Sequence, residues 1–154
     1  MQENLENEPE ITIRRLRPDD MDAVVALDAK VSGRRREEYF KAKLAMALSY
    51  SGIEVSLAAI VDNCLVGFLL AQVYYGEFGT TEKTAVLDTL DVHPRFRGRG
   101  VGHALIDQLK LNLQALRIHQ LSTSVGWQDQ ELLSFFYRSG FVPDAKISLS
   151  LEVC

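Results

Sequence analysis

Hydrophobic and polar positions along the chain follow two different periods, which predict alternating strands and helices. Apolar residues at every second position, or in short β-rich runs, predict strands at 11–14, 53–61, 65–75, 84–92, 119–125 and from 141 onward. Apolar residues spaced by three and four predict helices that start at about residue 20 and cover 34–49, 101–116 and 130–139. This order, β-α-α-β-β-β-α-β-α-β, predicts a mixed α/β (α+β) fold with a central mixed sheet and helices on both faces.

The connections between strands predict how they pair. The short break Asp62-Asn63-Cys64 between two β-rich runs predicts an antiparallel hairpin. The strand at 84–92 and the strand at 119–125 are separated by a whole helix, which is long enough for the two strands to run parallel. In the last strand, Ile147, Leu149 and Leu151 should share one face.

Composition and charge narrow the class of protein. The chain has 154 residues. Its length and the polar composition of its first ten residues predict a flexible tail at 1–10, followed by one domain at 11–154. Its net charge of −4 disfavours a nucleic-acid partner. An acidic N-terminus without a secretory signal, and the absence of an apolar run of about 18 residues, predict a cytoplasmic protein with no membrane partner. The two cysteines are expected to be reduced.

The segment between the strand at 84–92 and the following helix carries the candidate chemistry. Glycines alternate with other residues from Arg97 to Gly102, which lets backbone N–H groups approach a ligand closely. The helix that begins there leaves its first N–H groups unpaired and places a partial positive charge at the same point. Three arginines at 95, 97 and 99 add cations. Together these features predict an anion site, and a phosphate above all.

Other phosphate-binding motifs fit this loop less well. His103 stands where a dinucleotide fingerprint starting at Gly98 needs its third glycine, and 118–124 lacks the expected acid. The Gly-Lys-Ser/Thr end of a P-loop is absent. A glycine-rich turn with solvated arginines stays open as the plain structural alternative.

The segment Leu90-Asp91-Val92-His93-Pro94, followed by Arg97 to Gly102 and Ala104-Leu105, resembles the acetyl-CoA signature of the GNAT superfamily of N-acetyltransferases. The resemblance extends to 11–16, to Val66-Gly67-Phe68 and to the late segment 135–141. It implies an N-acetyltransferase that uses acetyl-CoA, without a metal, to acylate a primary amine on a small molecule or on a protein or peptide. A homodimer is a possible assembly, since dimers are common in this family.

The resemblance also implies which residues hold the donor. The backbone of three residues would pair with pantetheine, and the loop amides would hold the pyrophosphate. These residues are Leu90, Asp91 and Val92 for pantetheine, and Arg97, Gly98, Arg99, Gly100, Val101, Gly102 and His103 for the pyrophosphate. Where the family often has a cofactor-contacting asparagine, this chain has Asp129, which we expect to serve as a helix N-cap instead.

Acylation needs a neutral amine, and about one lysine side chain in 2,500 is neutral at pH 7. A base is therefore expected. Asp88 is the first candidate, directly or through water, because it should share a face with Leu90, whereas Asp91 should point the other way. A plain ion pair or hydrogen bond is the equally weighted alternative for Asp88. Glu77, in the preceding loop, is the reserve candidate.

The family's usual general acid is a tyrosine, and here that position is Phe136. Tyr137 is adjacent, but one helical step rotates it by about 100°, so it inherits the role only weakly. This departure leaves open a non-catalytic acyl-CoA sensor. The acceptor stays unidentified: Arg34-Arg35-Arg36 could attract an acidic acceptor, although a solvated helix start is the expected interpretation because Glu37 and Glu38 follow.

Overall fold

The computed structural model describes residues 8–49, 54–76, 79 and 81–154. Within it the chain divides into two compact units, one ending at Ser124 and the other running from Val125 to Cys154. Most of the expected N-terminal tail, and the reserve base candidate Glu77, lie outside the described residues. None of the helices in the described ranges is long and apolar enough to cross a membrane.

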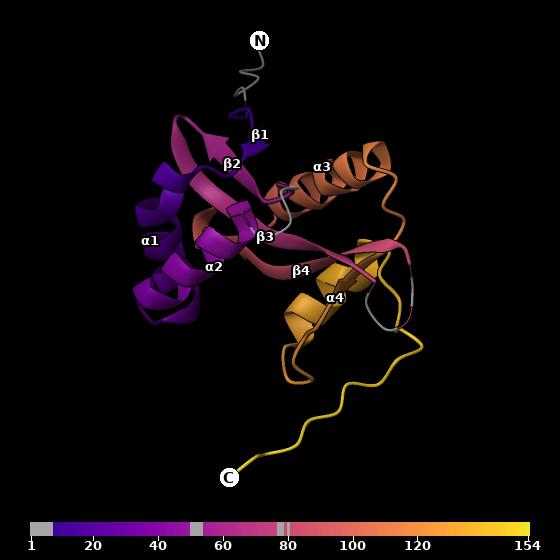
Figure 1. The fold of residues 1–154 in the computed structure, drawn as a ribbon. Coiled ribbons are helices and arrows are strands. Elements are labelled where there is room, and N and C mark those ends of the chain that lie inside the picture. The colour runs from indigo at the N-terminus through magenta and orange to yellow at the C-terminus, as the bar shows by residue number, and fades with distance from the viewer. Residues whose placement is uncertain (1–7, 50–53, 77–78, 80) are drawn as a thin grey trace, which may run out of the picture. The chain divides into compact units, whose positions relative to one another are not determined.

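The first unit is built on a five-stranded sheet in the order β1-β2-β3-β4-β5 (Figure 1). Its strands are β1 (Thr12–Arg15), β2 (Leu57–Val61), β3 (Cys64–Tyr75), β4 (Lys83–Val92) and β5 (Leu121–Thr123). From β1 to β4, each strand pairs antiparallel with the next, and β5 lies parallel to β4. The hairpin and the parallel crossover predicted from the connections are both confirmed.

The turn between β2 and β3 shows why the hairpin is tight. Asp62 and Asn63 adopt φ of 48° and 61°. A two-residue hairpin whose central residues both have positive φ matches the twist of the flanking strands, and Asp and Asn tolerate this conformation better than other non-glycine residues. The turn thereby sets Val61 opposite Cys64, and the β2-β3 register then shifts at an irregularity between Ala59 and Ile60.

Helices cover both faces of this sheet. On one face lie α1 (Met21–Ser32), which follows the 3-10 turn η1 (Pro18–Asp20), and α2 (Glu37–Ser49). Their core consists of buried apolar side chains from the helices and strands, among them Val24, Val25, Phe40, Phe68 and Leu70. On the opposite face lies α3 (Val101–Ala115), which follows the 3-10 turn η3 (Pro94–Phe96) (Figure 1). The expected fold class is confirmed.

Gly67 on β3 allows α3 to lie close to the sheet. A Cβ atom at this position would stand 2.9 Å from Cγ1 of Val101 and 3.2 Å from the carbonyl oxygen of Asp91. The absence of a side chain at Gly67 therefore allows the first turn of α3 to pack closely on the sheet beside β4. That turn carries the candidate phosphate loop.

The second unit contains α4 (Gln130–Arg138) and an extended C-terminal segment. Asp129 caps the helix, since its Oδ1 accepts a hydrogen bond from Leu132 N at 3.1 Å. The expected strand after Phe141 is wrong for this structure, because residues 141–154 are not assigned to any strand. The physical reason is that a strand needs a paired neighbour, and no strand is assigned anywhere between Val125 and Cys154.

Candidate active site

The parallel strands β4 and β5 separate in the middle of β4. Pairing covers Ala85 to Leu87 against Leu121 to Thr123, and Thr123 Oγ1 donates a hydrogen bond to Leu87 O at 2.9 Å. In the part of the chain that the structure describes, β5 pairs with no residue from Asp88 to Val92. Backbone groups of this stretch that point toward β5 are therefore available to an extended ligand, which could add to the strand edge.

The loop between β4 and α3 has the backbone of an anion site. Gly98 and Gly100 adopt φ of 74° and 82°, a conformation that side chains other than glycine rarely take. Gly100 is the N-cap of α3 and offers no side chain to bond the helix start. Helical bonding begins where Ala104 N donates to Gly100 O at 2.9 Å. The N–H groups of Val101 and Gly102 therefore lack an intrahelical acceptor and can bind a phosphate.

Positive charge surrounds this loop. Arg99 stacks on Phe96, with its Cζ 5.3 Å from the ring centroid. The pKa of His93 lies below its usual value, first because of partial desolvation of the ring and then because Lys30 and Arg95 add positive charge nearby. His93 Nδ1 accepts a hydrogen bond from Arg95 N at 3.1 Å, which ties the end of β4 to η3. The site therefore combines oriented amides with a cationic field.

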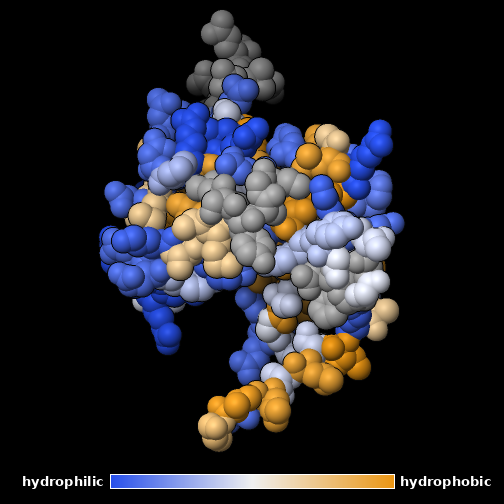
Figure 2. Space-filling view, in the orientation of Figure 1, coloured by the Kyte–Doolittle hydropathy of each residue, from blue (hydrophilic) through white to orange (hydrophobic). Residues whose placement is uncertain are grey.

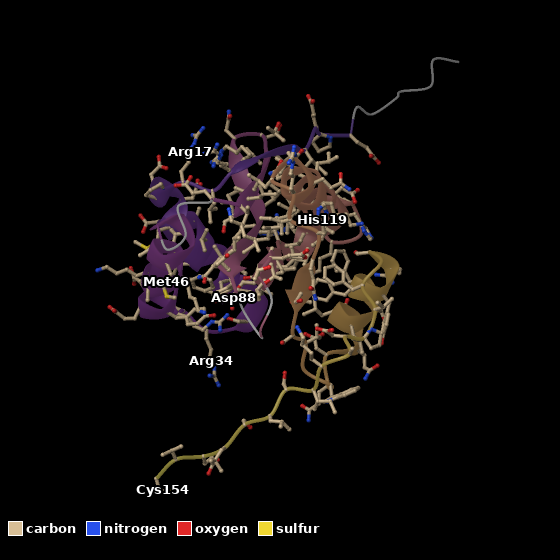
Figure 3. All side chains as sticks on the ribbon, turned by 45° about the vertical axis from the view of Figure 1, so that its right-hand side comes forward. Arg17, Arg34, Met46, Asp88, His119 and Cys154 are labelled. Atoms are coloured by element: carbon tan, nitrogen blue, oxygen red, sulfur yellow. The ribbon has the colours of Figure 1, made fainter. Side chains whose placement is uncertain are left out.

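Asp88 lies at an irregularity in β4. The register against β3 shifts between Leu70 and Ala71, so that these neighbours face Thr89 and Leu87 and Asp88 is the extra residue. The expectation that Asp88 shares a face with Leu90 is wrong, because the bulge breaks the alternation. Its carboxylate turns to α2, where Oδ2 lies 3.4 Å from Nζ of Lys43 (Figure 3).

Leu90 lies on the other face of the sheet. It pairs with Leu69, which alternates with Phe68 and so shares the α3 face with Gly67. Asp88 therefore lies on the α2 side of the sheet rather than on the α3 side. Asp88 thus forms an ion pair with Lys43, which was the alternative to its role as a base. Both side chains nevertheless keep about 30% of their surface exposed to solvent.

A second acidic side chain, that of Asp91 on β4, lies next to α1. The side chain of Asp91 is buried, and its Oδ2 has no hydrogen-bond partner among the described side chains and backbone. It lies next to Asp28 of α1, which is also buried. Burial, together with the hydrogen bond to Asp28 and its charge, raises the pKa of Asp91 to about 7. A protonated Asp91 that donates to Asp28 satisfies the otherwise orphaned oxygen.

Arg36 neutralises this acidic pair. Its guanidinium donates to both carboxylate oxygens of Asp28, at 3.0 Å and 2.7 Å. Burial alone would raise the pKa of Asp28, but the bonds from Arg36 and from Asp91 bring it below its ordinary value. Arg36 also lies over the Tyr39 ring at 5.0 Å. The expected solvated helix start is therefore wrong for Arg36.

Sequence reasoning missed the cluster of Asp28, Arg36 and Asp91, although one signal was present. Asp28 follows Val24, Val25 and Leu27 at helical spacing, so it falls on the buried face of α1. A carboxylate there needs a cationic partner. Nothing in the spacing of apolar residues along α2 singles out Lys43 in the same way.

The remaining predicted residues belong to the second unit. Phe136 is buried, and its ring packs against those of Phe135 and Phe141 with centroids 5.5 Å and 4.9 Å apart. Tyr137, one step along α4, is half exposed. The N-cap bond of Asp129 uses the carboxylate for the helix itself. Phe136 is therefore a packing residue, and Tyr137 does not take its place in the packing.

Comparison with known proteins adds an independent finding. A family model described as the acetyltransferase (GNAT) family matches residues 21–141. The "uncharacterized N-acetyltransferase ycf52" of Pyropia yezoensis is 35% identical over 104 residues, covering 66% of this chain and 55% of that protein. A protein of the same name from Porphyra purpurea is 33% identical over 104 residues with the same coverage. The chain thus spans about half the length of these curated relatives.

Solved structures share the fold at low identity. The aminoglycoside N-acetyltransferase AAC(6')-Iy in complex with CoA matches with a TM-score of 0.80 and 16% identity, covering 97% of this chain and 99% of that one. The ribosomal-protein-alanine N-acetyltransferase from Brucella melitensis biovar Abortus 2308 matches with a TM-score of 0.74 and 22% identity, covering 94% and 100%. At these identities the likeness concerns the fold alone.

Proposed function

The chain belongs to the GNAT acetyltransferase family, and on this premise we propose that it transfers an acetyl group from acetyl-CoA to a primary amine by direct attack in a ternary complex. The observation that carries the proposal is the glycine loop at the start of α3, with Gly98 and Gly100 at φ of 74° and 82°. The loop follows the stretch of β4 that pairs with β3 but, among the described residues, not with β5. Such a pair of features suits a ligand with a diphosphate at one end and an amide-rich arm at the other.

The donor would lie along these two features in sequence. The pyrophosphate takes the amides from Arg97 to His103, where the helix start and the arginines favour negative charge. The pantetheine arm adds to the edge of β4 through the backbone of Leu90, Asp91 and Val92. Each hydrogen bond to a charged group contributes roughly 1.5–3 kcal/mol, so a few loop amides suffice for firm binding.

The acceptor amine would approach from the side of α2, where Asp88 turns. In the proposed reaction the Asp88 carboxylate accepts a proton from the attacking nitrogen, directly or through water, as the new C–N bond forms and the C–S bond of the thioester breaks. A thiol of pKa near 8.5 leaves well as the thiolate. The reaction can therefore proceed without a dedicated acid at Phe136, and Tyr137 stays the weaker candidate for that role.

The free energy needed to deprotonate the acceptor depends on the pKa of its amine. At pH 7 this cost is roughly 4.6 kcal/mol for a lysine side chain and about 1 kcal/mol for an α-amino group. A single exposed carboxylate such as Asp88 suits the less basic amine better. We therefore place α-amino groups and other amines of lowered pKa first among the acceptors to be tested. The cytoplasm stays the predicted place of the reaction.

Thermal-shift measurements with acetyl-CoA, CoA and ATP test the donor half. Stabilisation by both CoA species and none by ATP is the expected result, and no shift with either CoA species would overturn the proposal. A thiol-release assay then tests turnover across N-terminal peptides, amino acids, polyamines and aminoglycosides. Acetyl-CoA-dependent release that rises with one acceptor class is expected.

One observation favours a second candidate, a non-catalytic acyl-CoA sensor. Phe136 occupies the position where the family usually has the tyrosine that serves as general acid. Its ring packs against those of Phe135 and Phe141. Firm CoA binding without thiol release for any acceptor class in the assay would select this candidate over the enzyme.

A further inference from the structure

A cluster of charged side chains ties the end of β4 to the junction between α1 and α2. Asp91 of β4 and Asp28 of α1 keep only 8% and 1% of their surface exposed. Arg36, directly before α2, donates to both carboxylate oxygens of Asp28, and Ser32 Oγ donates to Oδ2 of the same residue at 3.3 Å. Figure 2 shows mostly hydrophilic side chains over the outer side of α1, so the two carboxyl groups lie beneath a polar surface.

The net charge of this cluster depends on one proton. With a proton on Asp91, the negative charge of Asp28 is balanced by the positive charge of Arg36, and the cluster is neutral. Without that proton, two neighbouring buried carboxylates share one guanidinium group, and a net negative charge stays buried. A buried charge that lacks a partner is costly, which favours the protonated form.

Few other charges act on Asp91. The titratable or charged groups that face it are Asp28 from α1, Arg36 from the start of α2 and Arg97 from the glycine loop. On β3 its paired neighbour is Phe68, which does not titrate. The proton on Asp91 is therefore governed by Asp28 and by two arginines, one of which belongs to the candidate donor site.

The place of Asp91 in the sheet relates this proton to the donor. Its backbone belongs to the stretch of β4 that, among the described residues, pairs with no residue of β5. An ionised Asp91 puts a negative charge close to the loop for a diphosphate and attracts Arg97, because opposite charges interact strongly where water is partly excluded. A neutral Asp91 leaves Arg97 to the phosphates. The protonated cluster therefore suits an anionic donor, and the ionised cluster opposes it.

We propose that Asp91 is a positioning residue for the donor, because the proton that it shares with Asp28 keeps the end of β4 neutral and leaves Arg97 to the diphosphate of acyl-CoA. The inference rests on the proposed donor site and adds control of donor affinity by one buried proton. Because coupling between two binding events is reciprocal, the donor in turn favours the protonated cluster. Near pH 7, CoA binding should therefore be accompanied by proton uptake at Asp91.

Calorimetric titration with CoA between pH 6 and pH 8 tests this control. Burial and Asp28 raise the pKa of Asp91 to about 7. When only the protonated form binds, the Kd rises roughly tenfold over this range, because the competent fraction falls to about one tenth at pH 8. Asp91→Asn cannot ionise, so its Kd should depend on pH less steeply than that of the wild type by about this factor. Asp22→Asn, at an exposed acid of α1, should keep the wild-type profile.

Other groups that titrate in this range are common to the proteins compared. The phosphate monoester of CoA has a pKa near 6, and the ring of His93 lies at the end of β4. Both titrate in the wild type and in Asp91→Asn alike. The difference between the two profiles therefore isolates Asp91. Titrations in two buffers of different ionisation enthalpy measure the proton uptake directly, and the uptake should be smaller in Asp91→Asn.

Arg36→Gln tests the direction of the effect. Gln keeps a donor for Asp28 but removes a positive charge that lowers the pKa of Asp91, so the midpoint of the Kd profile should move to higher pH. Arg35→Gln is the matched control. It removes the same charge from an exposed side chain of the same junction, where Arg35 lies 3.7 Å from Glu37, and should leave the midpoint in place.

The outcomes separate this inference from the proposed function. Equal Kd profiles and equal proton uptake in the wild type and Asp91→Asn would overturn the inference and leave the cluster a purely structural one. A midpoint moved equally by Arg35→Gln and Arg36→Gln would overturn it too, since general surface charge would then explain the shift. Where Arg36→Gln does not fold, the comparison of the wild type with Asp91→Asn still decides. No binding of CoA at any pH would instead overturn the donor site itself.

Discussion

Nζ of Lys43 lies 3.4 Å from Oδ2 of Asp88 and joins α2 to the bulge in β4. Both side chains keep about 30% of their surface exposed. An ion pair this exposed contributes about 0.2–1 kcal/mol to stability, because water screens it and two flexible side chains must be ordered. Breaking the ion pair, as the proposed use of Asp88 as a base requires, would therefore cost little stability.

This relationship separates a catalytic role of Asp88 from a structural one. Asp88→Asn keeps the shape of the side chain but cannot accept the proton of the attacking amine. We expect kcat to fall by about 10²–10⁴-fold, the usual contribution of a general base, while the Kd for CoA stays within twofold. Steady-state thiol release and calorimetric CoA binding measure the two quantities.

Lys43→Met is the matched control for Asp88→Asn, since it removes the same ion pair and keeps the carboxylate. Its free energy of unfolding should change by less than about 1 kcal/mol, and its kcat should stay near that of the wild type. Equal losses of turnover in both variants would assign the effect to the ion pair. Unchanged turnover in Asp88→Asn would dismiss Asp88 as the base and make Glu77→Gln the next variant to measure.

The glycine loop makes a separate prediction about the donor. Gly100→Ala at φ of 82° should destabilise the protein by about 1–2 kcal/mol and shift the loop amides. The loss of one charged hydrogen bond then weakens CoA binding by about 10–100-fold. Gly33→Ala is the control, because Gly33 has a φ of 76° and, like Gly100, no atom near the position of an added Cβ.

Gly33→Ala should lose similar stability in urea unfolding and keep its affinity for CoA. Equal weakening of CoA binding in both variants would show that the loss follows from general destabilisation. Unchanged binding in Gly100→Ala would remove the loop from the donor site.

The loop could be predicted from the sequence because its chemistry is local. Glycines, arginines and a helix start lie within six residues, so their spacing in the chain is also their spacing in space. The face of Asp88 could not be predicted in the same way. Alternation places it with Leu90, and a single extra residue in the register against β3 reverses that. The alternation of apolar and polar residues along β4 does not indicate the bulge.

Long-range partners were equally hidden. Lys43 and Asp88 are far apart in the sequence, as are Asp28 and Asp91, and only the packing of α1 and α2 on the sheet brings each pair together. The segment after Phe141 shows the converse. Its sequence alternates as a strand does, but a strand forms only with a neighbour, and the second unit as described supplies none.

The Asp91 carboxyl predicts a dependence of stability on pH. Its pKa is raised from 3.8 to about 7, first by burial and then by Asp28. Between these values the folded protein holds a proton that the unfolded chain releases, so this contribution to stability is complete below about pH 4 and is lost as the pH rises through 7. Asp91→Asn cannot ionise and should avoid that loss.

We expect Asp91→Asn to gain stability over the wild type as the pH rises, with the difference widening by about 2–3 kcal/mol between pH 5 and pH 8. Urea unfolding at both pH values measures it. Asp22→Asn, at an exposed acid of the same helix that carries Asp28, should show no such widening. A constant difference between wild type and Asp91→Asn across this range would contradict a shared proton.

Asp129 separates a capping role from a role in donor binding. Its Oδ1 accepts from Leu132 N at 3.1 Å, so Asp129→Ala removes the cap of α4 and should lower the free energy of unfolding by about 0.5–2 kcal/mol. Asp129→Asn keeps an acceptor oxygen and should recover most of that loss. Because the carboxylate is used by the helix, the Kd for CoA should stay within twofold in both variants. A large loss of CoA affinity in Asp129→Ala that Asp129→Asn repairs would instead place this side chain against the donor, as the asparagine of the family suggests.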